Sequence, residues 1–386
     1  MSIKPPDMDK ATLLEIARLA TGCLDLRIGT WESTTLSVQG RRSIFRFAGT
    51  GEDNAGSRPW SVVLKQIQAP EDPDAPDAAR EHCYYWEREY LLYKSGVPQS
   101  LTDGGLRAPR CYGTAQPAAD LRWIWLEDLH DHYDGNWPVA QYANTAYHLG
   151  VFNGAYLVNK TIPPDEYLVR DGLRCDSENH ISAFNRYRDP SVWEHPLLQR
   201  AYTEPVIETL DQLATERDKL LDILDSLPQT FCHRDAWHGN MAAVENADGS
   251  ESTVLFDWAL AGYGPPGVEI GNLIWSAFLE FKFKVNAKNV NRLEREVFYN
   301  YLQGLADSGW QPDPVRVRIA YLIRSVLLFG FQLEGVDHAL AEDVYKETEQ
   351  FYGQPIEELV SQSAQVTYFL IKRIDELRSY LNSLFS

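Results

Sequence analysis

The chain has 386 residues, of which 44% are hydrophobic and 12% aromatic, which is enough to bury a large core in two lobes or domains. Its formal net charge of -19 disfavours nucleic acid and anionic membranes as partners and favours attraction of a cationic substrate. The five cysteines form no Cys-x-x-Cys pair, which indicates no zinc or redox motif. No signal peptide and no apolar run of membrane-spanning length is visible, so we expect a soluble cytoplasmic protein.

The amino-terminal part of the sequence predicts one helix followed by a small antiparallel sheet. Apolar residues at helical spacing indicate a helix over 9–20. Residues rich in Thr, Val, Ile and Phe over 31–47 predict two strands around a turn at 39–42. A second turn, at 49–59, precedes a third strand that ends at Lys65. This arrangement is typical of a lobe that binds nucleotide phosphates.

Two features of this sheet predict contacts with nucleotide phosphates. The first turn offers a lone glycine rather than a glycine-rich loop, but the backbone N–H groups from Gly40 to Ser43 are able to reach a phosphate. Lys65 suits the α and β phosphates and needs a glutamate partner from the next predicted helix, over 78–95. Glu87 and Glu89 compete for this role, because residues two apart lie about 200° apart around a helix.

The rest of the chain alternates apolar segments with Pro- and Gly-rich breaks. Strands are predicted over 108–113 and 123–126, and a long helix with an apolar stripe over 138–159. Residues 161–201, which include Tyr167, are read as an irregular insertion over the substrate cleft. Further helices are predicted over 204–227, 286–308, 314–330, 340–351 and 355–383.

One stretch near the middle of the chain carries the chemistry. A His-Arg-Asp sequence ends at Asp235 and is followed five residues later by Asn240. A turn and a short apolar strand over 253–256 then lead to Asp257. Phosphoryl transfer needs this set: one carboxylate orients the attacking hydroxyl, while an amide oxygen and a second carboxylate hold Mg²⁺ on the phosphates.

These residues resemble the aminoglycoside phosphotransferase and choline kinase group, which comprises small-molecule kinases with a protein-kinase-like fold. That group carries His-Gly-Asp-x-x-x-x-Asn followed by Asp-Trp, and this chain has Asp235, Asn240 and Asp257-Trp258. It departs from the pattern at Arg234, where the group usually has Gly. It departs again at Glu269, where the acid that braces the catalytic loop is usually Asp.

The resemblance covers about 34–276 and implies an α+β, two-lobed fold that uses ATP and Mg²⁺. A sheet-containing N-lobe would span 1–128 and a mainly helical C-lobe 129–386. The implied site residues are Asp235 as base, Asn240 and Asp257 as metal ligands, Lys65 paired with Glu89, Gly40 and Ser43 at the phosphates, and Glu127 and Leu129 at the adenine edge.

The substrate is less defined than the reaction. An aminoglycoside-type or other amine-bearing small molecule is the leading expectation, and a nucleoside, a sugar or an amino alcohol stays open. Several acids of the carboxy-terminal helices either line a pocket for an amine or, as is more common for any single acid, belong to a solvated helix face: Glu280, Glu334, Asp337, Glu342 and Asp343. A nucleotide-binding scaffold with little turnover is the alternative class. A protein kinase is disfavoured, because the chain lacks Asp-Phe-Gly and the link from Asp257 to Glu269 is too short for an activation loop.

Overall fold

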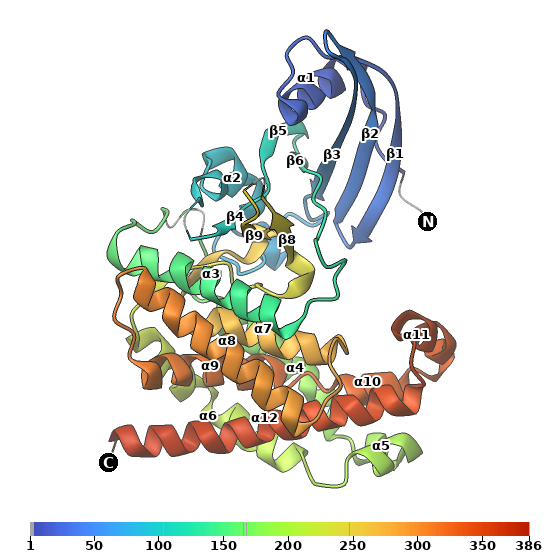
Figure 1. Ribbon diagram of the computed structural model, residues 1–386. Coiled ribbons are helices and arrows are strands. Elements are labelled where there is room, and N and C mark those ends of the chain that lie inside the picture. The colour runs from blue at the N-terminus through green and yellow to red at the C-terminus, as the bar shows by residue number, and fades with distance from the viewer. Residues whose placement is uncertain (1–3, 103, 165, 167, 247, 386) are drawn as a thin grey trace. The chain divides into compact units, whose positions relative to one another are not determined.

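The structure is a computed structural model that describes residues 4–102, 104–164, 166, 168–246 and 248–385 (Figure 1). The chain divides into two compact units that are interleaved in sequence. The first contains residues 1–132, 163–169 and 242–261, and the second contains 133–162, 170–241 and 262–386. The predicted lobe boundary between residues 128 and 129 stays a prediction.

The first unit is built on a five-stranded antiparallel sheet with the order β1-β2-β3-β6-β5, together with a smaller sheet ordered β4-β9-β8. Its helices and strands are α1 (Lys10–Thr21), β1 (Arg27–Gln39), β2 (Arg42–Asp53), β3 (Gly56–Gln68), α2 (Arg88–Ser95), β4 (Leu106–Arg107), β5 (Cys111–Ala118), β6 (Leu121–Glu127), β8 (Met241–Glu245) and β9 (Glu251–Leu255). Alternate residues of β2 and β3, among them Phe45 and Leu64, form one core with Leu13 and Ile16 of α1.

Two predictions for this unit were wrong in their extent. The turn between β2 and β3 is short, and the strands continue through most of the expected turn at 49–59, because Asp53 pairs with Gly56 across a tight hairpin. The helix expected over 78–95 begins only at Arg88. The preceding residues form turns, and the Arg88 guanidinium donates to the carbonyl groups of two of them, His82 and Cys83.

The second unit is mainly helical. Its elements are α3 (Val139–Val158), α4 (Gly172–Phe184), α5 (Pro196–Ala201), α6 (Ile207–Ser226), β7 (Thr230–Cys232), β10 (Gly262–Gly264), α7 (Val268–Leu279), α8 (Ala287–Asp307), α9 (Pro314–Phe329), α10 (Glu334–Leu340), α11 (Tyr345–Tyr352) and α12 (Ile356–Phe385). Helices α3 and α8 pack closely because glycines face the opposing backbone: a Cβ on Gly150 would lie 2.3 Å from the carbonyl oxygen of Tyr301.

The expected irregular insertion at 161–201 contains helices α4 and α5. Helix α4 has little apolar periodicity, so sequence pattern did not reveal it; it is anchored instead by buried Asp176 and Phe184. Tyr167, which belongs to the predicted insertion, lies outside the described residues. The helix expected over 340–351 begins later, at Tyr345, and α10 precedes it.

One apolar helical segment, Pro314–Leu340, is long enough to cross a membrane by length and composition. Its most apolar window is 89% buried inside the protein. Packing against other helices of the second unit therefore accounts for its apolar character.

Candidate active site

Three charged side chains from separate segments meet in the first unit. Lys65 lies on β3, Glu89 lies in the first turn of α2, and Asp257 follows β9. The Lys65 Nζ atom lies 2.5 Å from Glu89 Oε2 and 3.0 Å from Asp257 Oδ1. Glu87 pairs instead with Arg122, at 2.5 Å. Of the two competing glutamates, Glu89 is therefore the one that faces Lys65.

This triad combines one cation with two carboxylates in a largely buried setting. The side chains of Lys65 and Glu89 are 5% and 1% exposed, whereas Asp257 is 28% exposed. Burial opposes the charge on Lys65, but attraction by Asp257 and Glu89 outweighs it and raises the pKa of Lys65. Burial raises the pKa of Glu89, even though Lys65 favours its ionised form. Asp257 is the member of the triad that is open to a ligand from solvent.

Asp257 owes its position to an unusual backbone conformation. Its φ angle is 61°, in the left-handed region that Asp tolerates better than most residues. The next residue, Trp258, is fully buried, and its indole N–H donates to the carbonyl of Leu255 at 2.9 Å. The backbone N–H of Trp258 also donates to Glu89 Oε1 at 3.3 Å. The segment after β9 is thereby tied directly to the partner of Lys65.

Arg88 joins the same two segments from beside Glu89. Its guanidinium is buried and donates to the carbonyl of Cys83 at 2.7 Å and to the carbonyl of Ala259 at 3.0 Å. It therefore fixes the start of α2 against the segment that carries Asp257. Arg88 was not predicted from the sequence, although a second charged residue directly beside the expected partner of Lys65 was a usable signal, because a charge that becomes buried needs hydrogen-bond partners.

The predicted phosphate turn lies next to Lys65 along the sheet. Gly40 has a φ angle of 56° in the two-residue turn between β1 and β2. Ser43 is buried on β2, and its neighbour Ile44 pairs in register with Lys65. A cavity of about 290 Å³ opens beside this turn and is lined by Gly40, Arg41 and Arg42 among others.

The predicted adenine-edge residues lie at the end of β6 and just beyond it. The Glu127 carboxylate accepts two hydrogen bonds from Arg107, at 2.6 and 3.1 Å. Burial opposes ionisation of Glu127, but the Arg107 contacts prevail and lower its pKa. The Glu127 N–H donates to the carbonyl of Arg110 at 2.9 Å, so it is not the group that would meet a base edge. Leu129 follows outside the strand and is half-buried.

In the second unit, Asp235 is held by two amide side chains. Asn240 Nδ2 donates to Asp235 Oδ2 at 2.8 Å and to the Asp235 carbonyl at 3.1 Å. Asn272 Nδ2, from α7, lies 3.4 Å from Asp235 Oδ1. Because Asn240 donates through nitrogen, its amide oxygen is the atom suited to a metal. The structure therefore brings Asp235 and Asn240 together, and it adds Asn272, which the sequence analysis missed.

Glu269, on α7, braces the loop that carries Asp235. Its carboxylate accepts the backbone N–H groups of His233 and Arg234, the latter at 3.1 and 3.2 Å. Burial raises the pKa of Glu269 to about 7, against the influence of these two N–H groups. Glu in place of the usual Asp thus still reaches two consecutive amides of the loop.

A buried ionic network packs against the loop that carries Asp235. Arg234 Nη2 donates to Asp176 of α4 at 2.9 Å, and Arg324 of α9 lies 3.3 Å from the same carboxylate oxygen. Arg324 also donates to the Arg234 carbonyl at 2.9 Å and to Asn272 Oδ1 at 3.2 Å. Sequence analysis missed Asp176 and Arg324. A lone charge within the apolar stretch of α9 was the available signal, because a buried charge needs a partner.

Acidic and aromatic side chains gather at the far end of α7. Burial, and then the carboxylates of Glu280 and Asp337, raise the pKa of Glu334 to about 8. Burial also raises the pKa of Glu280. Phe281, which follows Glu280, contacts the ring of Tyr352 with centroids 5.0 Å apart.

The other acids predicted for an amine pocket are either paired with a basic side chain or exposed to solvent. Asp337 pairs with Arg186 at 2.7 Å, and Glu342 lies 3.1 Å from His195. Asp343 is exposed to solvent. Glu280 and Glu334 are therefore the pair whose charge burial disfavours most clearly.

An antiparallel sheet with a buried lysine–glutamate pair, in a chain whose second unit is mainly helical and carries a loop carboxylate held by amides, is typical of kinase-like phosphotransferases. The model of the phosphotransferase enzyme family matches residues 55–288, more than half of the chain. The chain belongs to this family and is a small-molecule kinase, a phosphotransferase with an alcohol group as acceptor.

Solved structures with a similar fold include choline kinase from Cryptosporidium parvum Iowa II, at 13% identity and a TM-score of 0.56, with 98% of this chain and 100% of that chain covered. Amicoumacin kinase hAmiN, solved with AMP-PNP and Ca²⁺, matches at 14% identity and a TM-score of 0.48, with 95% and 97% covered. A thermostable mutant of an aminoglycoside phosphotransferase, solved with ADP and hygromycin B, matches at 12% identity and a TM-score of 0.44, with 92% and 98% covered.

No curated protein matches the chain in sequence. The choline kinase likeness and the family match confirm the predicted α+β, protein-kinase-like fold. They also confirm the predicted family.

Proposed function

We propose that the protein transfers the γ-phosphoryl group of ATP, with Mg²⁺, to a hydroxyl group of a small molecule that carries an amine. The observation that supports this most directly is the Asp235 carboxylate, which is half-buried and held at both oxygens by Asn240 and Asn272. A carboxylate fixed in this way is suited to orient a hydroxyl and to accept its proton.

Asn240 and Asp257 are the proposed metal ligands. Mg²⁺ prefers oxygen ligands, and these residues offer an amide oxygen and a partly exposed carboxylate. Bound Mg²⁺ neutralises charge on the β and γ phosphates of the nucleotide. Lys65, held by Glu89, adds a fixed positive charge for the α and β phosphates.

The remaining nucleotide contacts are proposed from backbone positions. The N–H groups of the Gly40 turn and of Ser43 are suited to phosphate oxygens. The Glu127 carbonyl and the backbone of Leu129 are suited to the adenine edge, since the Glu127 N–H is already bonded to Arg110.

The amine-binding part of the proposal rests on Glu280 and Glu334. Their raised pKa values mean that burial disfavours two neighbouring negative charges, which a cationic amine would relieve. Phe281 and Tyr352 add aromatic faces that favour a cation. Glu280 follows Asn272 by eight residues along α7 and its end, a rise of about 12 Å, which suits a substrate of one or two sugar rings.

Other acceptors remain candidates for the same reaction: a nucleoside, a sugar or an amino alcohol. An amino alcohol as small as choline would span less than the distance along α7 if one molecule had to meet both Asp235 and Glu280. A scaffold without turnover is disfavoured because the Asp235 carboxylate and the Lys65–Glu89 pair are both intact.

Phosphate transfer to separate pools of compounds tests the reaction. The full chain is incubated with γ-labelled ATP and Mg²⁺ together with aminoglycosides, amino alcohols, nucleosides or sugars. We expect label in the aminoglycoside pool, its loss in Asp235→Asn, and strong loss of Mg·ATP binding in Asp257→Asn. Nucleotide binding without label in any pool would support the scaffold instead.

A second test concerns the amine. Glu334→Gln keeps the size of the side chain but removes its charge, so KM for an amine-bearing acceptor should rise while KM for ATP stays the same. Acceptor binding should also release a proton near pH 7, because a cation lowers the pKa of Glu334 from about 8. Calorimetry in two buffers of different ionisation enthalpy measures that proton. An unchanged KM and no proton release would remove Glu334 from the acceptor site.

A further inference from the structure

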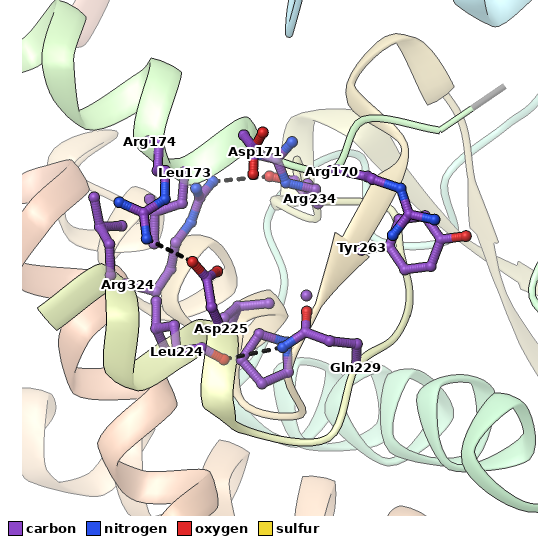
Figure 2. A pocket seen from close by; sticks show the side chains of 14 residues that line it. Arg170, Asp171, Leu173, Arg174, Leu224, Asp225, Gln229, Arg234, Tyr263 and Arg324 are labelled. Atoms are coloured by element: carbon purple, nitrogen blue, oxygen red, sulfur yellow. Dashed lines mark hydrogen bonds and ion pairs between the residues drawn. The ribbon is translucent and has the colours of Figure 1, made fainter. Parts of the chain in front are cut away.

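A small cavity lies beside the catalytic loop in the second unit, and its lining includes Arg234 but not Asp235. It is lined by the start of α4, the end of α6 and residues of the catalytic loop and α9 (Figure 2). Its volume is about 40 Å³. A single water needs about 10–15 Å³ by this kind of measure, so the cavity has room for a group of a few heavy atoms. It is too small for a nucleotide or a sugar.

The lining of this cavity is unusually basic for a chain with a net charge of -19. The charged residues that line it are Arg170, Arg174, Arg234, Arg324, Asp171 and Asp225. Arg174 is matched by acids, since it lies 2.6 Å from Asp225 (Figure 2) and 2.7 Å from Asp222. Exposed Asp171 is the remaining negative charge at the cavity, beside an exposed Arg170.

The two buried arginines are not fully compensated. Arg234 and Arg324 form ion pairs with one carboxylate, that of Asp176, which leaves a surplus of one positive charge among these three side chains. Glu269 also attracts both arginines, but burial raises its pKa to about 7, so its negative charge is only partly present at neutral pH. Burial lowers the pKa of Arg234, and repulsion from Arg324 acts in the same direction, despite attraction by Asp176. A buried surplus of this kind is costly unless a further anion is bound.

One hydrogen-bond donor at this site also lacks a partner. Arg234 Nη1 is buried and makes no hydrogen bond within the part of the chain that the structure describes. The whole residue is 5% exposed. The guanidinium fits against the start of α4 because residue 172 is glycine: a Cβ there would lie 1.4 Å from Arg234 Nη1. The amino-terminal N–H groups of α4 are not capped by the Asp171 side chain, so they add partial positive charge on the same side.

We propose that this cavity binds a small tetrahedral oxyanion, such as inorganic phosphate, between the Arg234 and Arg324 guanidinium groups and the start of α4. The bound anion supplies the missing acceptor for Arg234 and balances the surplus charge. The class of ligand follows from cavity size and from the fork of N–H donors that arginine offers to an oxyanion.

Occupancy of the cavity would act on the catalytic loop through two hydrogen bonds. The Arg234 carbonyl accepts from Arg324 at 2.9 Å and from Asn272 at 3.3 Å. Asn272 in turn lies 3.4 Å from Asp235 Oδ1. Arg234 has a φ angle of 70°, a strained conformation for a non-glycine residue that these contacts maintain. An anion that fixes both arginines therefore steadies Asp235, and this consequence for turnover rests on the proposed function.

Binding is tested without any assay of activity. The full chain is titrated with sodium phosphate at constant ionic strength, with chloride as the control anion, and heat and thermal stability are measured. Sulfate and a phosphate monoester form separate arms: binding of phosphate and sulfate alone indicates a free ion, whereas tighter binding of the monoester indicates a phosphorylated metabolite. We expect saturable binding of phosphate. Absence of saturable binding in every arm would overturn the proposal.

Three variants locate the site. Arg324→Gln removes the surplus charge and should weaken phosphate binding by about tenfold or more, as expected for loss of a charge-assisted hydrogen bond. Asp171→Asn removes a negative charge at the cavity and should tighten binding by up to about fivefold. Arg292→Gln removes an exposed positive charge elsewhere and should leave it unchanged. If Arg324→Gln fails to fold, an unchanged affinity in Asp171→Asn is sufficient to reject the site.

The effect on catalysis is measured with phosphate present at constant ionic strength. Saturating phosphate should raise kcat by about 2- to 10-fold in the wild type, the range for one hydrogen bond, and not in Arg324→Gln. Phosphate binding without a change in kcat would overturn the coupling to Asp235. Phosphate binding in a protein that labels no acceptor would reject the proposed function but leave the anion site intact.

Discussion

The ionic cluster around Lys65 and the ionic cluster around Arg234 differ in the sign of the charge that their own partners leave uncompensated. In the first unit, Lys65 faces two carboxylates, so the triad carries one excess negative charge and leaves Asp257 partly open. In the second unit, Arg234 and Arg324 share the carboxylate of Asp176, so these three side chains carry one excess positive charge and are largely buried. One group is suited to a cation such as a metal ion, the other to an anion.

This difference separates the residues that would meet substrate from those that hold them. Asp257 and Asp235 are partly exposed, whereas the residues that position them, Arg88, Glu269 and Arg324, are buried. A partly exposed carboxylate keeps its ability to bind a ligand, and a buried network keeps its geometry because breaking it costs several kcal/mol. Variants of the two kinds should therefore fail in different ways.

The largest effect is expected at Asp235. Asp235→Asn keeps the shape of the side chain but removes its charge, so kcat should fall by roughly 10²–10⁴, the range for a positioned acid–base group. Nucleotide affinity and unfolding should change little, because the amide oxygen of an Asn is able to accept the shorter hydrogen bond, from Asn240, and only the longer contact with Asn272 is lost. Steady-state kinetics and nucleotide titration measure the two quantities. The exposed residue Asp375, changed to Asn, serves as the control, and undiminished turnover in Asp235→Asn would remove Asp235 from the mechanism.

The next effect concerns stability in the second unit. Asp176→Asn leaves two buried guanidinium groups without their shared carboxylate, so the free energy of unfolding should fall by about 3–5 kcal/mol. The control is Asp222→Asn, which removes an acid paired with Arg174 but 74% exposed, and there the loss should be below about 1 kcal/mol. Urea unfolding measures both. Equal losses in the two variants would mean that burial does not distinguish the pairs.

The sequence predicted the residues whose type and spacing are set by chemistry. The fold class and the family are confirmed. A short sequence motif contains Asp235, Asn240 and Asp257, so their spacing is recognisable without a structure. Their roles stay predictions. The Lys65 partner required a choice between two glutamates, and the structure pairs it with Glu89 because α2 begins at Arg88 and Glu87 turns toward Arg122.

The supporting residues were not predicted, because their contacts join distant segments. Arg234 is 58 residues from Asp176, and Arg324 is 148 residues from it. The apolar periodicity of a strand or a helix does not identify a charged residue whose burial depends on an ion pair with a residue far away in the sequence. Helix α4 was missed for the same reason, since tertiary contacts of Asp176 and Phe184 stabilise it more than its own periodicity does.

A smaller effect is expected for the ion pair of Lys65 and Glu89, and it should be absent for the neighbouring acid Glu87. Lys65→Met and Glu89→Gln should each lower kcat/KM, and the double variant should lose less than the sum, with a coupling of about 0.5–3 kcal/mol. The reason is that Glu89 acts by holding Lys65, with 2.5 Å between the charged atoms. Glu87→Gln should show no coupling with Lys65→Met, since Glu87 binds Arg122. Strict additivity for Lys65 and Glu89 would contradict the pair as one functional unit.

The smallest effect is a pH dependence that belongs to Glu269. Burial raises its pKa from 4.5 in the unfolded chain to about 7, so the folded protein binds the proton more tightly. The folded state is therefore favoured at low pH, and this contribution is lost as pH rises from about 4.5 to 7. Between pH 6 and pH 8 the free energy of unfolding should fall by about 1 kcal/mol for this reason alone. Glu269→Gln cannot titrate and should lack that part of the decrease, whereas Glu347→Gln, at an exposed site, should retain it. Urea unfolding of the three proteins at both pH values measures the difference.

Because the ionised carboxylate is also the stronger acceptor for the His233 and Arg234 N–H groups, the same rise in pH should increase kcat in the wild type more than in Glu269→Gln. If the free energy of unfolding falls and kcat rises with pH in the wild type, and both changes are smaller in Glu269→Gln, then ionisation of Glu269 lowers stability while it fixes the catalytic loop. If both quantities change with pH to the same extent in the wild type and in Glu269→Gln, then Glu269 stays ionised throughout this range.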